Sequence, residues 1–194
     1  MLDLALTRKN YKLGLKITIK TIVSIVLIAL AIGLPQIVHL TVGSKGGMIW
    51  LPMYLPVLLA GCVLGVWWGL GVGIASPILS FLLTSINNNP MPALNRLPFM
   101  IVELAVFAVI SGLFSKKINK NKWMAFPAII LAQLAGRVTF ILMALIFQNV
   151  SGLSVEVVIS QIRTGVSGLI LQAVALPFIV IGLSIFLNKE KKND

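Results

Sequence analysis

The most informative residues of this sequence are the few polar side chains that lie inside apolar segments. Glu103 falls about six residues into an apolar run, and Arg96 lies seven residues before it, on the same face of a helix. Gln133 and Arg137 share a face of the next run, and Gln172 lies inside the last one. A charge at the centre of a bilayer costs at least about 2.5–3.5 kcal/mol, so such residues usually face a cavity or a partner. We therefore expect these three runs to line an outward-facing pocket.

The role of Glu103 has two interpretations at this stage. In the first, its carboxylate makes a direct polar contact with a ligand, and Arg96 closes the outer end of the site. In the second, Glu103 forms an ion pair with Arg137 that holds the helices together. A guanidinium and a carboxylate suit each other in either role. The spacing of the residues favours neither, so both interpretations stay open.

Two polar connections adjoin these runs. Residues 35–50 include His39, three glycines and Trp50, a composition that suits either a lid over the pocket or a plain solvated connector. His39 itself is either a ligand contact or a residue of the membrane interface. Residues 87–92 read NNNPMP, which predicts a turn-rich loop that leads directly into Asn95.

The candidate substrate-binding residues share a position in or beside the outer half of an apolar run: Glu103, Arg96, Asn95, Arg137, Gln133, His39 and Trp50. No pattern indicates catalysis. The sequence has no Gly-x-x-x-x-Gly-Lys-Ser/Thr phosphate loop and no His-Glu-x-x-His, and it has one histidine and one cysteine. We expect no enzymatic activity, no metal site and no cofactor.

The elements that must position these residues are membrane helices. The chain has 194 residues, of which 58% are hydrophobic and 11% charged, whereas soluble domains carry about 25% charged residues. A helix needs about 20 apolar residues to cross the bilayer core. We predict an all-α integral membrane protein, a six-transmembrane-helix bundle that forms one membrane domain over 1–194. Its spans lie near 17–34, 51–66, 69–84, 97–114, 124–147 and 160–187.

The distribution of basic residues predicts the orientation. Twelve of the 16 Lys and Arg residues precede the first span, join the fourth to the fifth, or follow the sixth. With both termini cytoplasmic, only Lys45, Arg96 and Arg163 lie outside, and Arg137 lies within a span. Cytoplasmic loops of membrane proteins carry such an excess. It explains most of the net charge of +11 without a nucleic-acid partner. Trp67, Trp68 and Trp123 are then expected at the inner interface, and Trp50 and Tyr54 at the outer one.

Small residues recur at a spacing of four in three spans. This spacing lets helix backbones approach closely in lipid. It is compatible with packing inside the bundle or with docking of another membrane subunit. The pairs are Gly61 with Gly65, Gly69 with Gly73, and Ala29 with Gly33.

Residues 51–61 (LPMYLPVLLAG) resemble the substrate-binding S components of energy-coupling factor (ECF) vitamin transporters. The similarity continues through the glycines of the next span and Ser76-Pro77 to Glu103-Leu104. It implies a multi-pass protein of the bacterial plasma membrane that captures a vitamin or vitamin precursor from outside. The first outer loop and helices four to six would form the site. A transmembrane coupling protein and two ATPase subunits would drive uptake, which fits the missing phosphate loop.

Some alternatives remain at this point. Family members often carry Ala-x-x-x-Ala early in helix one, where residues 21–25 here read TIVSI, so the docking surface is undetermined. A membrane scaffold of the cell-shape type has a similar size, and a self-sufficient secondary carrier is a third interpretation. Glu103 favours an aminated heterocycle as ligand, whereas Arg96 favours a carboxylate such as pantothenate.

Overall fold

A computed structural model describes residues 1–8, 11–43, 46–86, 90–151 and 155–189. All regular secondary structure in these ranges is helical, in the following order: α1 (Leu2–Arg8), α2 (Leu13–Val42), α3 (Gly46–Trp50), α4 (Tyr54–Leu64), α5 (Val66–Ser85), α6 (Leu97–Leu113), α7 (Ser115–Lys120), the 3-10 turn η1 (Lys122–Met124), α8 (Ala125–Ser151) and α9 (Val155–Lys189).

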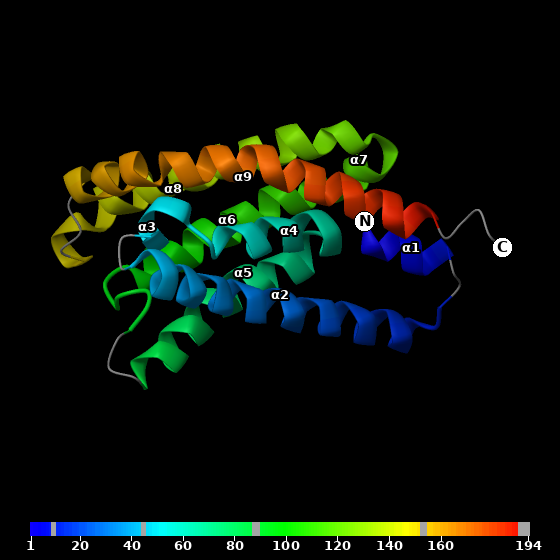
Figure 1. The fold of residues 1–194 in the computed structure, drawn as a ribbon, viewed down its shortest axis with the longest axis horizontal. Coiled ribbons are helices and arrows are strands. Elements are labelled where there is room, and N and C mark those ends of the chain that lie inside the picture. The colour runs from blue at the N-terminus through cyan, green and yellow to red at the C-terminus, as the bar shows by residue number, and fades with distance from the viewer. Residues whose placement is uncertain (9–10, 44–45, 87–89, 152–154, 190–194) are drawn as a thin grey trace.

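The predicted fold class is confirmed. Within the described ranges, six helical segments are long and apolar enough to cross a membrane, with α3 and α4 together counting as the second. The long helices run side by side along the molecule (Figure 1). Each corresponds to one span expected from the sequence, and the short helices α1, α3 and α7 were not predicted as separate elements.

The first helix is longer than expected. Hydropathy placed its end at Pro35, but α2 continues through this proline to Val42. Proline removes one backbone hydrogen bond, and membrane helices tolerate that loss where local adjustments satisfy the freed groups. His39 therefore lies on the last turns of α2 and not in a loop.

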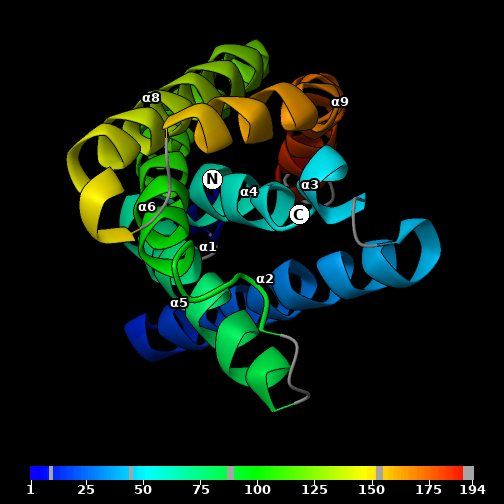
Figure 2. The ribbon, with the colours of Figure 1, turned by 90° about the vertical axis from the view of Figure 1, so that its left-hand side faces the viewer.

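Helix α4 forms the centre of the bundle. It packs against α2, α5 and α6, and the end view shows it surrounded by the long helices (Figure 2). Val57, Leu58 and Ala60 of α4 are fully buried, as are Leu104 and Phe107 of α6. A helix that is apolar on all sides is stable in this central place, because no face has to meet solvent.

Glycines let α4, α5 and α6 approach closely. A Cβ on Gly61 would lie 2.6 Å from a carbonyl oxygen of α6, and one on Gly73 would lie 2.8 Å from another. A Cβ on Gly69 would lie 2.8 Å from the Cα of Gly61. These three glycines therefore serve packing inside the bundle. Gly65 has a φ of 88° at the turn from α4 to α5, a conformation that glycine adopts without strain.

The pair on α2 behaves differently from the other small residues. A Cβ on Gly33 would meet nothing within 4 Å, and Ala29 is exposed. Their role is not packing within this chain, and docking of another subunit stays a prediction.

The two ends of the bundle differ in charge. The start of α2, helix α7 and the end of α9 lie together at one end, and α3 lies at the other (Figure 1). Lysines are concentrated in the elements of the first end, at the start of α2 and in α7 and η1. Trp67 and Trp123 are 82% and 67% exposed, at the start of α5 and in η1. This grouping agrees with the predicted basic face and aromatic belt, while the side of the membrane that it occupies stays a prediction. Lys45 lies outside the described residues.

Candidate functional site

A cavity of about 420 Å³ lies at the end of the bundle that contains α3, opposite α7. Its wall is built from the end of α2, helix α3, residues 51–53, the start of α4 and the segment 91–96, with two positions each of α6 and α8 and one each of α5 and α9. A volume of this size is within the range of pockets that bind small molecules.

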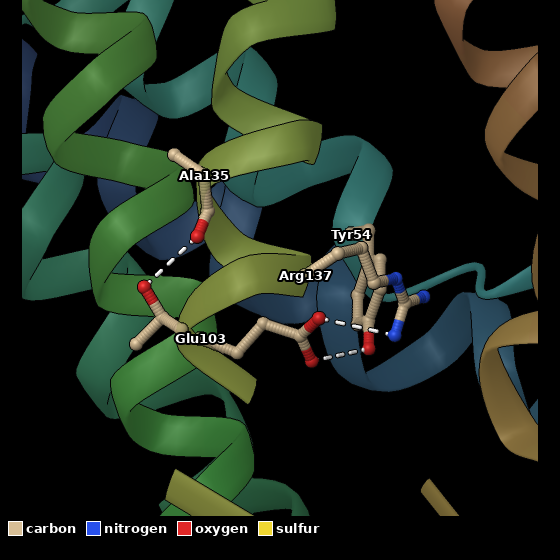
Figure 3. Close-up of polar contacts among 5 residues, drawn as sticks. Tyr54, Glu103, Ala135 and Arg137 are labelled. Atoms are coloured by element: carbon tan, nitrogen blue, oxygen red, sulfur yellow. Dashed lines mark hydrogen bonds and ion pairs between the residues drawn. The ribbon is translucent and has the colours of Figure 1, made fainter. Parts of the chain in front are cut away.

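A polar cluster formed by Tyr54, Glu103 and Arg137 lines the inner part of this cavity, and we call it the Glu103 cluster. The Tyr54 hydroxyl donates a hydrogen bond of 2.7 Å to Glu103 Oε2. Arg137 Nη1 lies 3.1 Å from Glu103 Oε1. Figure 3 shows the phenol and the guanidinium together on one side of the Glu103 carboxylate, which faces both, and α4, α6 and α8 each contribute one member. The ion pair of the second interpretation is thus present in the structure.

The hydrogen-bonding capacity of this cluster is not fully used. Glu103 is 1% exposed and Arg137 is 8% exposed. Although the two charges are close, the Arg137 N–H is not aligned with Glu103 Oε1, which accepts no hydrogen bond from the described residues. Nε and Nη2 of Arg137 also have no acceptor in the described part of the chain. The guanidinium carbon lies 5.1 Å from the centre of the Tyr54 ring, a cation–π distance that helps to hold the side chain.

The remaining wall is largely apolar and rich in methionine. Four of the seven methionines line the cavity, and an unbranched thioether adapts readily to the shape of a ligand. The apolar lining includes Met48, Leu51, Met53, Met91, Met100 and Phe140.

The segment from 90 to 96 is fastened to α5. The hydroxyl of Ser80 donates a hydrogen bond of 2.8 Å to the Met91 carbonyl oxygen, and the Met91 N–H donates one of 2.7 Å to the Thr84 hydroxyl. These contacts hold Met91 and the residues that follow it at the cavity. The sequence predicted a turn-rich loop here but not these hydrogen bonds to α5.

Helix α3 closes another side of the cavity and is fastened to α9. Gln172 Nε2 donates to the carbonyl oxygens of Trp50 at 3.0 Å and Leu51 at 2.9 Å. A Cβ on Gly168 would lie 2.8 Å from the Trp50 carbonyl oxygen, so glycine permits this approach. Leu51 has a φ of 49°, an unfavourable conformation for a leucine that the surrounding contacts must stabilise. The segment expected to be either a lid or a connector therefore contains a short helix that is packed against the bundle.

Four of the seven predicted site residues line the cavity: Glu103, Arg96, Arg137 and His39. Glu103 of α6 and Arg96, seven positions earlier, both line the cavity. Arg96 is half-buried and directly precedes α6.

The other three predicted residues lie outside the cavity lining. Gln133 is buried and donates a hydrogen bond of 3.2 Å to the Leu169 carbonyl oxygen, which links α8 to α9. Asn95 is exposed. Trp50 has a side chain that is 40% exposed, and only its backbone carbonyl takes part in fastening α3.

Tyr54 and Gln161 line the cavity although the sequence did not single them out as site residues. Tyr54 was expected at the outer interface, but it is buried and donates to Glu103. Gln161 of α9 lines the cavity, and its Nε2 has no acceptor in the ranges that the structure covers. No three His, Cys, Asp or Glu side chains of those ranges lie together as metal ligands would.

The fold and the cavity define a multi-pass helical membrane protein with an internal space of small-molecule size. Comparisons with family models, with curated proteins and with solved structures find no match.

Proposed function

We propose that this protein captures a vitamin or vitamin precursor at the membrane and that its uptake requires an ATP-driven module. In this proposal the chain acts as the S component of an ECF transporter. Its partners are a transmembrane coupling protein and two ATPase subunits. The observation that supports it most is the cavity of about 420 Å³, which combines a buried polar cluster with an adaptable apolar wall. A scaffold protein has no use for such a site.

The position of the cavity agrees with capture from outside. It lies at the end opposite the basic elements, which the positive-inside rule assigns to the cytoplasm. A ligand would reach the Glu103 cluster past α3, the segment 91–96 and the end of α2. In the proposed orientation these elements face the outer aqueous phase.

The segment that resembles the S components contributes directly to the cavity. Leu51, Pro52, Met53 and Tyr54 line it, and Gly61 packs α4 against α6. Energy for uptake has to come from partners, because the sequence has no phosphate loop.

Reconstitution in liposomes tests this proposal. Protein alone, supplied with yeast extract as the source of solutes, should bind a solute without concentrating it inside the vesicles. Co-reconstitution with the coupling protein and ATPases of an ECF transporter should give ATP-dependent accumulation, measured by mass spectrometry of the vesicle contents. Accumulation by the lone protein under an ion gradient would instead identify a secondary carrier.

A cavity-filling substitution provides the matched control. Met100→Trp places a large side chain in the cavity and should abolish both binding and uptake. Leu113→Trp on the same helix is directed outwards, where the native side chain is 59% exposed, and should retain both. Equal uptake by the two variants would contradict a role for this cavity.

A further inference from the structure

The unused hydrogen-bonding groups of Arg137 point to the chemistry of the ligand. A guanidinium presents its N–H groups along edges, and the edge formed by Nε and Nη2 binds a carboxylate with two parallel hydrogen bonds. Glu103 lies next to Nη1, so it does not occupy this edge. Nε and Nη2 are the two nitrogens that have no acceptor among the described residues, and Arg137 lines the cavity. This carboxylate-binding edge of Arg137 is therefore shielded from solvent and has no acceptor among the described residues.

The charge balance of the cavity points the same way. Its described lining contains two arginines, Arg96 and Arg137, and one carboxylate, Glu103. The charges of these three side chains sum to one positive charge. Uncompensated charge in an apolar wall is costly, and a monoanion would balance it. Gln161 Nε2 adds a further donor without an acceptor within the described ranges.

The Glu103 carboxylate is poorly placed to select a cationic group. One oxygen accepts the hydrogen bond from Tyr54, and the other lies beside Arg137. A cationic ligand would have to compete with that guanidinium at 3.1 Å for the same oxygen. Nε and Nη2 of Arg137 have no such competitor among the described residues.

We propose that the cavity binds a small organic acid, whose carboxylate is held by the Nε–Nη2 edge of Arg137 together with Arg96 and whose apolar part contacts the methionine-rich wall. This inference rests on the proposed capture function and specifies the class of its ligand. It chooses the carboxylate over the aminated heterocycle, two alternatives that the sequence left open.

Ligand retention from a complex mixture tests the inference. Purified protein in detergent is incubated with yeast extract and washed, and the compounds released by denaturation are identified by mass spectrometry in both ion modes. The wild type should retain a compound with an acidic group. Arg96→Gln should weaken its binding by about tenfold to a hundredfold, the range for one lost charge-assisted hydrogen bond. Arg163→Gln is the matched control, because Arg163 is exposed on α9 and should not affect retention.

Two further variants separate ligand binding from folding. Arg137→Gln alone leaves Glu103 buried without its partner, so its failure to fold would be uninformative. The double variant Glu103→Gln/Arg137→Gln removes both charges and keeps polar side chains, and it should fold but lose the acid. Glu103→Gln alone should strengthen binding of the acid, because it removes a negative charge beside Arg137. If Glu103 contacted a cationic ligand directly, the same change would weaken binding.

Each outcome distinguishes the inference from the function on which it rests. Retention of a neutral or cationic compound would overturn the inference and leave capture intact. Retention of an acid at equal affinity by the wild type, Arg96→Gln and the double variant would overturn the assignment of the residues. If the wild type retained no compound, the capture function would fail and the inference with it.

Discussion

The hydrogen bond from Tyr54 to Glu103 allows a quantitative test of the Glu103 cluster. Tyr54→Phe removes only the hydroxyl, which donates at 2.7 Å to a carboxylate that is 1% exposed. A hydrogen bond to a charged group contributes about 1.5–3 kcal/mol, and Tyr54→Phe leaves Glu103 Oε2 without this donor. The ring can stay in its edge-on contact with Phe107, at 4.9 Å between ring centres. We expect the free energy of unfolding to fall by about 1.5–3 kcal/mol.

The matched control for this substitution is the other tyrosine of the chain. Tyr11 is half-buried, and Tyr11→Phe should change the free energy of unfolding by less than about 0.5 kcal/mol. Both values come from reversible unfolding with sodium dodecyl sulfate in mixed micelles, followed by far-UV circular dichroism. Repeating Tyr54→Phe in a Glu103→Gln background should reduce its cost to about 0.5–1.5 kcal/mol, because the acceptor is then neutral.

The reasoning would be refuted by either of two results. One is a Tyr54→Phe cost as small as that of Tyr11→Phe. The other is an undiminished cost in the Glu103→Gln background, which would show that the hydroxyl does not act through the carboxylate.

Two further pairs of variants test the packing and the fastening of α3. Gly73→Ala should lower the free energy of unfolding by about 1–3 kcal/mol, because its Cβ would lie 2.8 Å from the Leu104 carbonyl oxygen. A Cβ on Gly71 would meet nothing within 4 Å, so Gly71→Ala should be neutral or stabilise the protein by up to about 1 kcal/mol. Equal losses of unfolding free energy in the two variants would contradict the close approach of α5 and α6 at Gly73. Gln172→Met removes the hydrogen bonds that hold α3 against α9, a loss of about 0.5–1.5 kcal/mol. Because α3 closes one side of the cavity, the dissociation rate of the ligand should rise by about two- to tenfold. Gln133→Met loses one hydrogen bond away from the cavity, so stopped-flow release of the retained compound should be unchanged, and equal acceleration would contradict the role of Gln172.

Hydropathy predicted the fold well because lipid imposes a strong constraint. Every backbone polar group in the bilayer must be satisfied within the chain, so long apolar runs become helices. The same signal placed the end of the first span at Pro35, where the structure continues to Val42. It also began the second span at residue 51 and assigned residues 35–50 to an outer connection, whereas helix α3 (Gly46–Trp50) forms there before the bend at residues 51–53. The place where a helix breaks depends on tertiary contacts, such as the hydrogen bonds of Gln172 to Trp50 and Leu51. Hydropathy carries no information about these contacts.

Residue type and position within the apolar runs predicted part of the cavity lining, including Arg137 and His39. The spacing of Arg96 and Glu103 was sufficient to place both on one face, and both line the cavity. Tyr54 lies 49 positions before Glu103, and its contact arises from the packing of α4 on α6. Gln133 has the residue type and spacing of a site residue, but it faces α9 and serves packing. Sequence periodicity predicts on which face of its helix a residue lies. Which residue of another helix it contacts depends on how the helices are arranged in space, and periodicity does not contain that information.

Native mass spectrometry of the intact protein tests the central claim most directly. Protein isolated from the cells that express it and released gently from detergent should show one small-molecule adduct per chain. That adduct should be absent from Met100→Trp, which fills the cavity, and present in Leu113→Trp, which does not. Adducts of lipid alone, or a small-molecule adduct retained equally by Met100→Trp, would contradict capture in this cavity.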